Sequence, residues 1–298
     1  MNGIIVIDKP QGMTSHDVVS FLRQKTGVKR IGHTGTLDPM ATGVLPVFIG
    51  KATRLIEYAN KPGDPEAKLY RCTMKLGIET DTQDIWGTPL TQSGSEYMPE
   101  ISEIKRVLKS FEGAGVQKPP MYSAVKVGGR KLYEYARKGA AVDEGLIKAR
   151  DIYIKEIYVN GIDISMGEVC FDVLCSKGVY IRTLCADAGR LLGCGAVMSG
   201  LVRLKSESFL IESAISFETI QKCEALSLLP VDIAIEWLPR VELGDEDARA
   251  FAQGRKVSLP EQGQDLGIIR VYNCEELLGI GITRENAWIK PEKVICEQ

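Results

Sequence analysis

Residues 30–47 have the sequence RIGHTGTLDPMATGVLPV, in which glycines, threonines and prolines surround one histidine and one carboxylate. The first part is polar and rich in glycine, which is typical of a loop, and the last four residues begin an apolar strand that ends at Gly50. Asp38 is the only acidic residue between Asp17 and Glu57. The stretch therefore predicts a loop of defined shape that enters a strand and carries a single carboxylate.

Hydrophobic periodicity and cap residues predict further elements on both sides of this loop. Expected strands cover residues 3–8, 44–50 and 68–77. Expected helices cover residues 15–27 (capped by Thr14 or Ser15), 51–59, 100–113 and 180–193. Residues 151–178 predict a hairpin of two long strands, with its turn near Asn160-Gly161, because Asn-Gly favours a tight hairpin turn. Strands and helices mix without a repeating strand–helix–strand rhythm, so the expected fold class is α+β, with a mixed, largely antiparallel central sheet flanked by helices.

The composition changes near Pro239, where a second unit is expected to begin. The last 60 residues contain short β-like segments such as LGIIRVYN and LLGIGITRENAWIKP. These segments predict a small β-rich module attached to a larger domain. We therefore expect one domain at residues 1–236, with an insertion at about 118–145, and a second domain at residues 237–298.

The overall composition excludes several classes of protein. Of the 298 residues, 44% are hydrophobic and 26% are charged, which is the profile of a folded globular protein. No apolar run approaches the roughly 20 residues that a membrane span requires. The N-terminal sequence MNGIIVIDKP has an acid where a signal peptide would remain apolar. These features predict a cytoplasmic protein without membrane contact.

Neither a metal site nor a nucleotide site is indicated by residue spacing. The eight cysteines form no Cys-x-x-Cys pair, and His16 and His33 are the only histidines, so no zinc site assembles by spacing. The sequence IGKAT at residues 49–53 lacks the glycine spacing of a phosphate loop, and Ala follows its Lys instead of Ser or Thr. We expect reduced cysteines and no cofactor.

The charge is distributed unevenly along the chain. The net charge is −2 overall, but residues 1–210 carry +5 and residues 211–298 carry −7. Residues 118–138, KPPMYSAVKVGGRKLYEYARK, hold six basic residues, one acidic residue and three tyrosines. Basic side chains neutralise phosphates and aromatic rings stack on unpaired bases, so this segment favours nucleic-acid binding. The alternative is a solvated helical hairpin packed by its tyrosines.

Asp38 has two interpretations from local sequence. An Asp before Pro39 often forms a turn and bonds to its own backbone. Alternatively, the surrounding glycines allow a backbone to approach a ligand closely, and the carboxylate acts as a nucleophile. Glycoside hydrolases usually need two carboxylates, whereas one isolated carboxylate fits covalent catalysis in which the leaving group needs no second acid.

Two further residues are candidates for roles beside Asp38. Arg182, in SKGVYIRTL, lies where a strand gives way to a helix, and an arginine beside a buried carboxylate keeps that carboxylate ionised. His33 is isolated from other histidines and has no Ser or Cys motif nearby, which argues against a metal site and a serine-type triad. It is either structural or a planar, hydrogen-bonding wedge beside a substrate base.

Six motifs occur along the chain in the order DKPQGMTSHDVV, RIGHTGTLDPMATGVLPV, AKLYRCTMKLGIETDTQD, PPMYSAVKVGGRKLYEYARKG, SKGVYIRTL and GLVRL. In sequence and order they resemble the TruB family of tRNA pseudouridine-55 synthases, and they span nearly the whole chain. The resemblance implies a pseudouridine-synthase catalytic domain, in which the insertion grips RNA, and a C-terminal PUA-like RNA-binding module. It also implies isomerisation of a uridine in the T loop of tRNA, without cofactor or metal.

The resemblance assigns catalytic roles to three residues. Asp38 matches the catalytic aspartate, Arg182 the arginine paired with it, and Tyr70 the active-site tyrosine that stacks on the target base. The resemblance also assigns RNA contacts. His33 matches the histidine that supports the flipped-out conformation, and Leu201 matches a leucine that lines the uracil pocket.

Further RNA-binding residues expected from the matching motifs are Lys9, Tyr122, Lys126, Arg130, Lys131 and Tyr180. Val202 stands where many relatives have a second arginine.

In the implied reaction the target uridine leaves the base stack, as in other enzymes that modify bases. Ionised Asp38 then attacks ribose C1′ or base C6, or helps to form a glycal after the C1′–N1 bond breaks, and the uracil reattaches through C5. The expected partner is the T stem-loop of tRNA, bound by a monomer that needs no guide RNA or protein partner. Three alternatives remain: a non-catalytic RNA-binding or RNA-folding factor, a guide-RNA-dependent relative of dyskerin, and a hydrolytic nucleosidase.

Overall fold

The computed structural model describes residues 1–92, 97–140, 142–259, 266–284 and 288–296. Ala141, which belongs to the expected insertion, and residues 260–265, 285–287 and 297–298, which belong to the expected C-terminal domain, lie outside the described residues.

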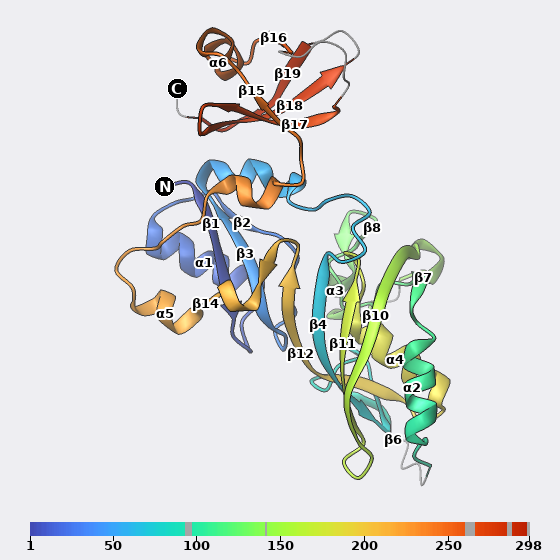
Figure 1. The fold of residues 1–298 in the computed structure, drawn as a ribbon. Coiled ribbons are helices and arrows are strands. Elements are labelled where there is room, and N and C mark those ends of the chain that lie inside the picture. The colour runs from blue at the N-terminus through green and yellow to red at the C-terminus, as the bar shows by residue number, and fades with distance from the viewer. Residues whose placement is uncertain (93–96, 141, 260–265, 285–287, 297–298) are drawn as a thin grey trace.

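The described elements form one large sheet, one smaller C-terminal sheet and two short hairpins (Figure 1). The α-helices are α1 (Ser15–Thr26), α2 (Ile101–Lys109), α3 (Leu132–Ala136), α4 (Ile181–Leu192), α5 (Phe217–Lys222) and α6 (Asp245–Ala252). The 3-10 helices are η1 (Gly50–Tyr58), η2 (Glu144–Leu146), η3 (Ile211–Ser213) and η4 (Val231–Ile235).

The strands of the large sheet are β1 (Gly3–Lys9), β2 (Ile31–His33), β3 (Thr42–Ile49), β4 (Lys68–Leu76), β7 (Gly113–Gln117), β10 (Arg150–Asp163), β11 (Glu168–Cys175), β12 (Ala196–Ser206), β13 (Phe209–Leu210) and β14 (Ile215–Ser216). Its main path has the order β14-β1-β3-β12-β4-β11-β10-β7. Only the pairs β1–β14 and β3–β12 are parallel among the described strands of this sheet. The α+β class with a mixed, largely antiparallel central sheet is therefore confirmed.

The parallel contact between β3 and β12 joins the two halves of the sheet. It consists of two residue pairs, Val202 with Thr42 and Arg203 with Gly43. At Gly43 the backbone has a φ of 100°, and a Cβ there would overlap the backbone of Arg203. Glycine is therefore required where the two strands meet, because it accepts positive φ and leaves room for the neighbouring chain.

Helix α1 begins and ends where the cap residues predict. The Thr14 hydroxyl accepts the N–H of Asp17 at 3.0 Å, and the Asp17 carboxylate accepts the N–H of Thr14 at 2.8 Å. This reciprocal pair is a capping box, and replacing such a cap costs about 1 kcal/mol. Gly27 closes the helix in the left-handed conformation, with a φ of 70°. Apolar residues of α1 and α4 pack into the same core as the central strands.

The turn of the long hairpin differs from the expectation. Strands β10 and β11 pair as expected, but the pairing shifts between Val159 and Gly161, so Asn160 lies at a bulge and not in the turn. The chain turns after Asp163, whose carboxylate accepts the N–H of Met166 at 3.1 Å. Gly167 then adopts a φ of 61°. The prediction of a turn at Asn160-Gly161 was wrong, because the Asp163 side chain stabilises a turn further along the chain.

The C-terminal sheet contains β15 (Arg240–Glu242), β16 (Val257–Ser258), β17 (Ile268–Asn273), β18 (Glu276–Arg284) and β19 (Trp288–Val294), in the order β15-β17-β18-β19-β16. Helix α6 and this sheet enclose a separate core that includes Phe251, Ile269 and Val271. The prediction of a small β-rich, PUA-like module is confirmed in fold, and the boundary at residue 237 stays a prediction.

The C-terminal module packs on η1, which directly follows β3 (Figure 1). The prediction of a helix at residues 51–59 holds in position, although its geometry is 3-10. Leu55 of η1 lies in one buried cluster with Leu238 and Ile280. The Arg54 guanidinium donates to the carbonyl of Val294 at 2.6 Å, which ties the two parts together.

Candidate active site

Two hydrogen bonds with Ser15, the first residue of α1, hold the loop that carries Asp38. The Ser15 hydroxyl accepts the N–H of Leu37 at 2.9 Å and donates to its carbonyl at 3.1 Å. The N–H of Ala41 donates to the carbonyl of Asp38 at 3.0 Å, so the segment from Asp38 to Ala41 forms a turn. The turn interpretation therefore holds for the backbone of Asp38. The Asp38 carboxylate takes no part in this turn and contacts a different residue.

That contact is Arg182. Its Nε lies 2.8 Å from Oδ2 of Asp38, and the arginine side chain is only 5% exposed. Arg182 is the second residue of α4, and its two terminal nitrogens donate to the carbonyls of Thr82 and Tyr122 at 3.1 and 2.9 Å. The guanidinium is therefore fixed in one orientation, with Nε aimed at the carboxylate.

Tyr180 positions the start of α4. Its N–H donates to Oε1 of Gln117 at 2.7 Å, and its carbonyl accepts from Nε2 of the same residue at 3.0 Å. The edge strand β7 thus holds the first turn of the helix that carries Arg182. The Tyr180 side chain is half-buried.

Burial raises the pKa of Asp38 above its ordinary value, and the charge of Asp84 raises it further. The positive charge of Arg182 and its hydrogen bond oppose this shift. The Asp38 side chain keeps 36% of its surface exposed, so a ligand can reach it. The site therefore combines a partly desolvated carboxylate with one arginine that favours its ionised form.

Asp84 is a functional candidate that the sequence analysis missed. One of its oxygens lies 4.0 Å from Nη1 of Arg182, and the residue is buried. Its other oxygen accepts the N–H of Trp86 at 3.0 Å and the hydroxyl of Thr82 at 2.9 Å. Two carboxylates therefore share Arg182. The motif GIETDTQD contains Asp84, but only the fold shows that this turn meets the Asp38 loop.

Tyr70 and Leu201 lie on neighbouring strands that face the same core. In the pairing of β4 with β12, Tyr70 is opposite Arg203 and Leu201 is opposite Cys72. Tyr70 and Leu201 are each 9% exposed. Burial raises the pKa of Tyr70 to about 12, although nearby Arg203 favours the phenolate. At neutral pH the phenol is therefore protonated.

Arg203 supports the Asp38 loop from the sheet. Its guanidinium donates to the carbonyls of Val44 and Gly35 at 2.7 and 3.0 Å, and the residue is 1% exposed. Lys68 lies close by, in a buried ion pair with Glu207. These contacts hold the glycine-rich part of the loop against β12.

His33 ends β2 and carries no charge at neutral pH. Burial, with help from the charge of Arg203, lowers its pKa to about 4. Its Nδ1 and the hydroxyl of Thr34 are buried, and neither has a hydrogen-bond partner among the described residues. Buried polar atoms without partners are uncommon in folded proteins. The two groups lie next to each other on the loop that carries Asp38.

Lys9 lies inside the protein and not on its surface. It is 0% exposed, and its ammonium donates to the carbonyls of Pro10 and Met13 at 2.8 and 2.7 Å, with Pro39 at 3.5 Å. Burial lowers its pKa to about 8, and the charge of Asp38 opposes this shift. The expectation that Lys9 contacts RNA directly does not agree with this placement, because its donors bond to the backbone beside Asp38.

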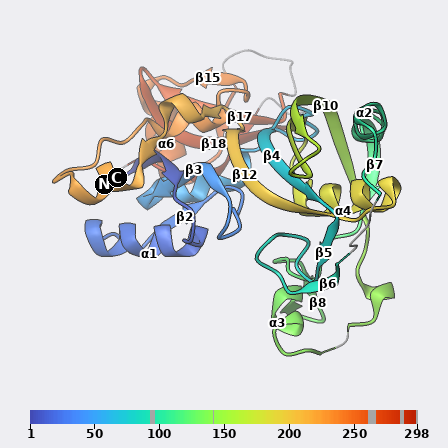
Figure 2. The ribbon, with the colours of Figure 1, turned by 90° about the horizontal axis from the view of Figure 1, so that it is seen from below.

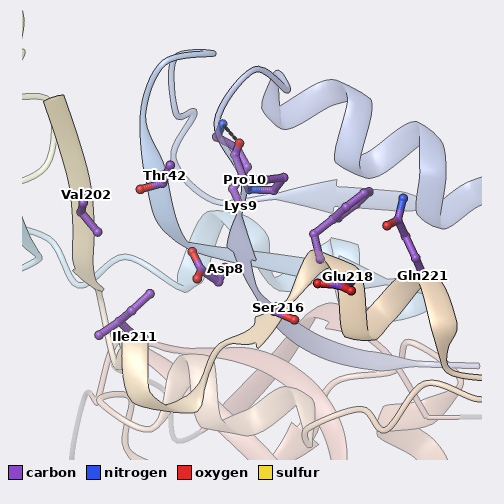
Figure 3. A pocket seen from close by; sticks show the side chains of 10 residues that line it. Asp8, Lys9, Pro10, Thr42, Val202, Ile211, Ser216, Glu218 and Gln221 are labelled. Carbon is purple, nitrogen blue, oxygen red and sulfur yellow. Dashed lines mark hydrogen bonds between the residues drawn. The ribbon is translucent and has the colours of Figure 1, made fainter. Parts of the chain in front are cut away.

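Lys9 and Val202 also border a pocket of about 510 Å³ between β1, β12 and α5 (Figure 3). Figure 3 shows Val202, Thr42 and Asp8 along one side of this pocket. Neither Asp38 nor Arg182 belongs to its lining. Val202 contributes an apolar side chain to the lining of this pocket.

The basic segment forms a hairpin and a short helix. Strands β8 (Lys126–Val127) and β9 (Arg130–Lys131) pair across Gly128 and Gly129, both at positive φ, and α3 follows. The alternative prediction of a helical hairpin was therefore wrong, because two successive glycines favour a tight β-turn.

Lys126 and Arg130 are exposed, whereas Lys131 is half-buried with its ammonium over the ring of Tyr133. Tyr122 connects this segment to the site, because its hydroxyl donates to Asp81 and its carbonyl accepts from Arg182. Basic side chains thus extend away from the Asp38–Arg182 pair along one arm.

Three family models match consecutive parts of the chain. The model of the TruB family pseudouridylate synthase N-terminal domain matches residues 23–181. The tRNA pseudouridylate synthase B C-terminal domain matches residues 182–235, and the pseudouridine synthase II TruB C-terminal model matches residues 239–295. The chain belongs to the TruB family. The family resemblance expected from the motifs is thereby confirmed, and so is the prediction of an enzyme of the pseudouridine synthase class.

Curated relatives and solved structures agree with TruB membership. The tRNA pseudouridine synthase B of Alkaliphilus oremlandii is 42% identical over 294 residues, covering 95% of this chain and 94% of that one. The enzyme of the same name from Clostridium novyi is 39% identical, covering 99% of this chain and all of its own. Among solved structures, a Cbf5-Nop10-Gar1 complex matches with a TM-score of 0.71 and 28% identity, over 98% of this chain and 84% of that one.

Within the part of the chain that the structure describes, no group of three or more His, Cys, Asp or Glu side chains is arranged to hold a metal ion. No described helix is both long and apolar enough to span a bilayer.

Proposed function

We propose that this TruB protein converts the uridine at position 55, in the T loop of tRNA, to pseudouridine, with Asp38 as the nucleophile. The observation that carries the proposal is the ion pair between Asp38 and Arg182, in a loop that also presents His33. Relatives at 37–44% identity carry the name tRNA pseudouridine synthase B. Their name supports the substrate class, and the contact with Arg182 supports Asp38 as the reacting group.

The proposed reaction starts with the target nucleotide turned out of its stack, which costs a few kcal/mol that protein contacts must offset. In one route an Asp38 oxygen bonds to ribose C1′ while the C1′–N1 bond breaks. In a second route the oxygen adds to C6 of the base and the C1′–N1 bond then breaks. In a third route the C1′–N1 bond breaks and Asp38 takes the C2′ proton, which leaves a glycal. In every route the uracil rotates, C5 bonds to C1′, the C5 proton leaves to a base and N1 takes up a proton. The bond to Asp38 breaks in the first two routes, and the proton returns to C2′ in the third. Reactant and product are isomers, so no oxidant or group donor is consumed.

Three residues are proposed to hold the uracil. Tyr70, with its phenol protonated, stacks on the ring from the β4 side, and Leu201 lines the pocket from β12. His33 is a neutral imidazole, so it lies beside the extruded base without adding a charge.

The arm at residues 118–145 is proposed to bind the phosphates of the T stem. Lys126 and Arg130 are exposed there, and their charges lie beyond Tyr122, which contacts the site. We further propose that the protein acts as a monomer in the cytoplasm, without a guide RNA or protein partner. The solved H/ACA structure bound to a substrate RNA, at 25% identity and a TM-score of 0.69, belongs to a multi-component particle.

Incubation of the purified protein with an unmodified T-arm stem-loop tests the proposal. Chemical mapping of pseudouridine is the required measurement, because mass does not change on isomerisation. A single modified uridine at position 55 is the expected product. Release of free uracil would identify a hydrolytic nucleosidase instead, and activity only after addition of a guide RNA would place the protein with the dyskerin relatives.

The variant Asp38→Asn separates catalysis from binding. We expect loss of at least about 1,000-fold in product formation, because an amide is a poor nucleophile, while affinity for the stem-loop changes by less than about threefold. Asn has nearly the size of Asp, and its amide oxygen can still accept from Arg182. Asp84 keeps a carboxylate 4.0 Å from the guanidinium, so we expect the fold to be retained. Unchanged pseudouridine formation in this variant would exclude Asp38 as the nucleophile and favour a non-catalytic role for the loop.

A further inference from the structure

The turn between β5 (Ile78–Thr80) and β6 (Pro89–Gln92) is held firmly although it lies at the surface. The carbonyl of Asp84 accepts the hydroxyl of Thr80 at 2.7 Å, and the N–H of Ile85 donates to Met198 of β12 at 2.9 Å. A Cβ on Gly87 would overlap the side chains of Thr82 and Asp81, so only glycine permits this packing. The turn therefore keeps one shape before any ligand arrives.

This turn is part of the surroundings of Arg182. The carbonyl of Thr82 accepts from the Arg182 guanidinium, and the Asp84 carboxylate lies 4.0 Å from it. Asp81 accepts the hydroxyl of Tyr122, which belongs to the basic arm. Figure 2 shows β5 and β6 beside β8 and α3 of that arm. The turn thus lies between the Asp38–Arg182 pair and the positive charges proposed to bind RNA.

The turn presents large apolar side chains at this position. Trp86 is 55% exposed and Ile85 is 38% exposed. The backbone N–H of Trp86 donates to the carboxylate of Asp84, the residue that faces Arg182. The backbone of Trp86 therefore lies next to the candidate active site. A fixed turn that leaves a tryptophan half in solvent beside a ligand site is a ready surface for a planar ligand.

We propose that Trp86 stacks on an unpaired base of the RNA next to the extruded nucleotide. This inference rests on the proposed function, because it takes the T-arm RNA as the ligand. Turning one nucleotide out of a loop removes a stacking partner from its neighbours. An aromatic ring restores that contact for any base, since every base has a π-face. Trp86 is thereby a positioning residue that favours the extruded state and leaves the chemical step to Asp38.

Affinity measurements in the Asp38→Asn background test the inference without turnover. Trp86→Ala is expected to weaken stem-loop binding about tenfold, the size of one lost base–aromatic stack. Trp86→Phe keeps a ring and is expected to stay within about threefold, whereas Trp86→Leu keeps apolar area without a ring and is expected to resemble the alanine variant. In the active enzyme the same series is expected to change KM and leave kcat nearly constant.

Two controls separate stacking from other contacts. Tyr158→Ala removes an aromatic side chain that is 64% exposed on β10, and no effect on binding is expected. A fully paired RNA duplex offers no free base, so its affinity is expected to be equal for all Trp86 variants. Quenching of tryptophan fluorescence by the stem-loop, which we expect to be smaller in Trp86→Phe than in the wild type, provides an independent signal of a base against this indole.

The outcomes distinguish this inference from the proposed function. If the wild-type protein forms pseudouridine and Trp86→Leu binds the stem-loop as tightly as Trp86→Phe, stacking is wrong while the function stands. If sedimentation shows a dimer that Trp86→Ala dissociates, with RNA affinity unchanged, the patch is a protein contact and the inference is overturned. If the wild type forms no pseudouridine, the proposed function is wrong, and the stacking inference that rests on it is wrong as well.

Discussion

Arg182 decides the electrostatics of the site at the scale of single residues. It is buried and lies between the carboxylates of Asp38 and Asp84. Removing the partner of a buried ion strongly destabilises the folded state. The buried Arg182 guanidinium therefore needs at least one of the two carboxylates beside it. The motif SKGVYIRTL predicted an arginine near Asp38. Asp84 belongs to a different motif, GIETDTQD, and no local pattern relates it to Arg182. The two residues approach each other only when the turn after β5 packs against α4.

We expect Arg182→Ala to move the acid limb of the pH–rate profile to higher pH. The pKa of Asp38 already lies above its ordinary value because of burial, and Arg182 is the largest cause that lowers it. Without the arginine the pKa rises further, so the ionised carboxylate is lost at a higher pH as the solution is acidified. Single-turnover rates between pH 5 and 9 measure the shift.

Arg190→Ala is the matched control for this prediction, since Arg190 lies on the same helix and pairs with Asp187 at the surface. Its profile is expected to coincide with that of the wild type. An unshifted profile for Arg182→Ala would show that the arginine does not set the charge of Asp38.

The surroundings of Lys9 could not be predicted from the sequence. A lysine next to Pro10 in a turn after a strand fits a phosphate contact as readily as a structural one. The structure buries the ammonium against backbone carbonyls of Pro10, Met13 and Pro39, which satisfies its donors internally. Burial of a long side chain depends on the path of a loop 30 residues away in the chain, and sequence patterns do not contain that path.

At the scale of elements, α4 depends on close packing against β12. Gly189 lies so near the strand that a Cβ would overlap the backbone of Ala196. We expect Gly189→Ala to lower the free energy of unfolding by about 2 kcal/mol, since overfilling a packed contact forces the backbone to shift. It is also expected to reduce activity, because α4 carries Arg182. Denaturant unfolding and single-turnover assays provide the two measurements.

Gly161→Ala is the control at a glycine with open space and a negative φ. A change below about 0.5 kcal/mol is expected there. Equal stability of both variants would show that α4 has room to move away from the sheet.

Several long periodic elements could be predicted from the sequence, but the central strand β12 was not, and the errors have physical causes. Strands and helices with strong periodicity and clear caps, such as α1 and α4, have the predicted bounds to within a residue or two. The hairpin turn was misplaced because Asn-Gly has two uses, a turn or a bulge, and the Asp163 side chain decides between them. The arm was ambiguous because its tyrosines fit both a helix and a strand, until paired glycines set the turn.

At the scale of the whole molecule, the unequal charge distribution predicts salt-dependent binding. Phosphate contacts release counterions, so log affinity falls linearly with log salt concentration. We expect Lys126→Ala and Arg130→Ala each to reduce the slope by about one, with little effect on which RNA is preferred. Binding isotherms at several salt concentrations measure the slopes.

Lys109→Ala serves as the control, because Lys109, the last residue of α2, pairs with Glu112. Its slope is expected to equal that of the wild type. A flat salt response of the wild-type protein would contradict a phosphate-binding arm altogether.

Strand β3 connects the Asp38 loop at one end with η1, and through η1 with the C-terminal module, at the other. Eight extended residues span about 26 Å, and the strand is buried in the middle of the large sheet, where it cannot stretch or bend freely. The distance between the Asp38 carboxylate and the C-terminal module is therefore fixed by the length of this strand. An RNA that contacts the Asp38 loop and the C-terminal module at once must span that distance. Inserting or deleting residues in β3 would change the distance.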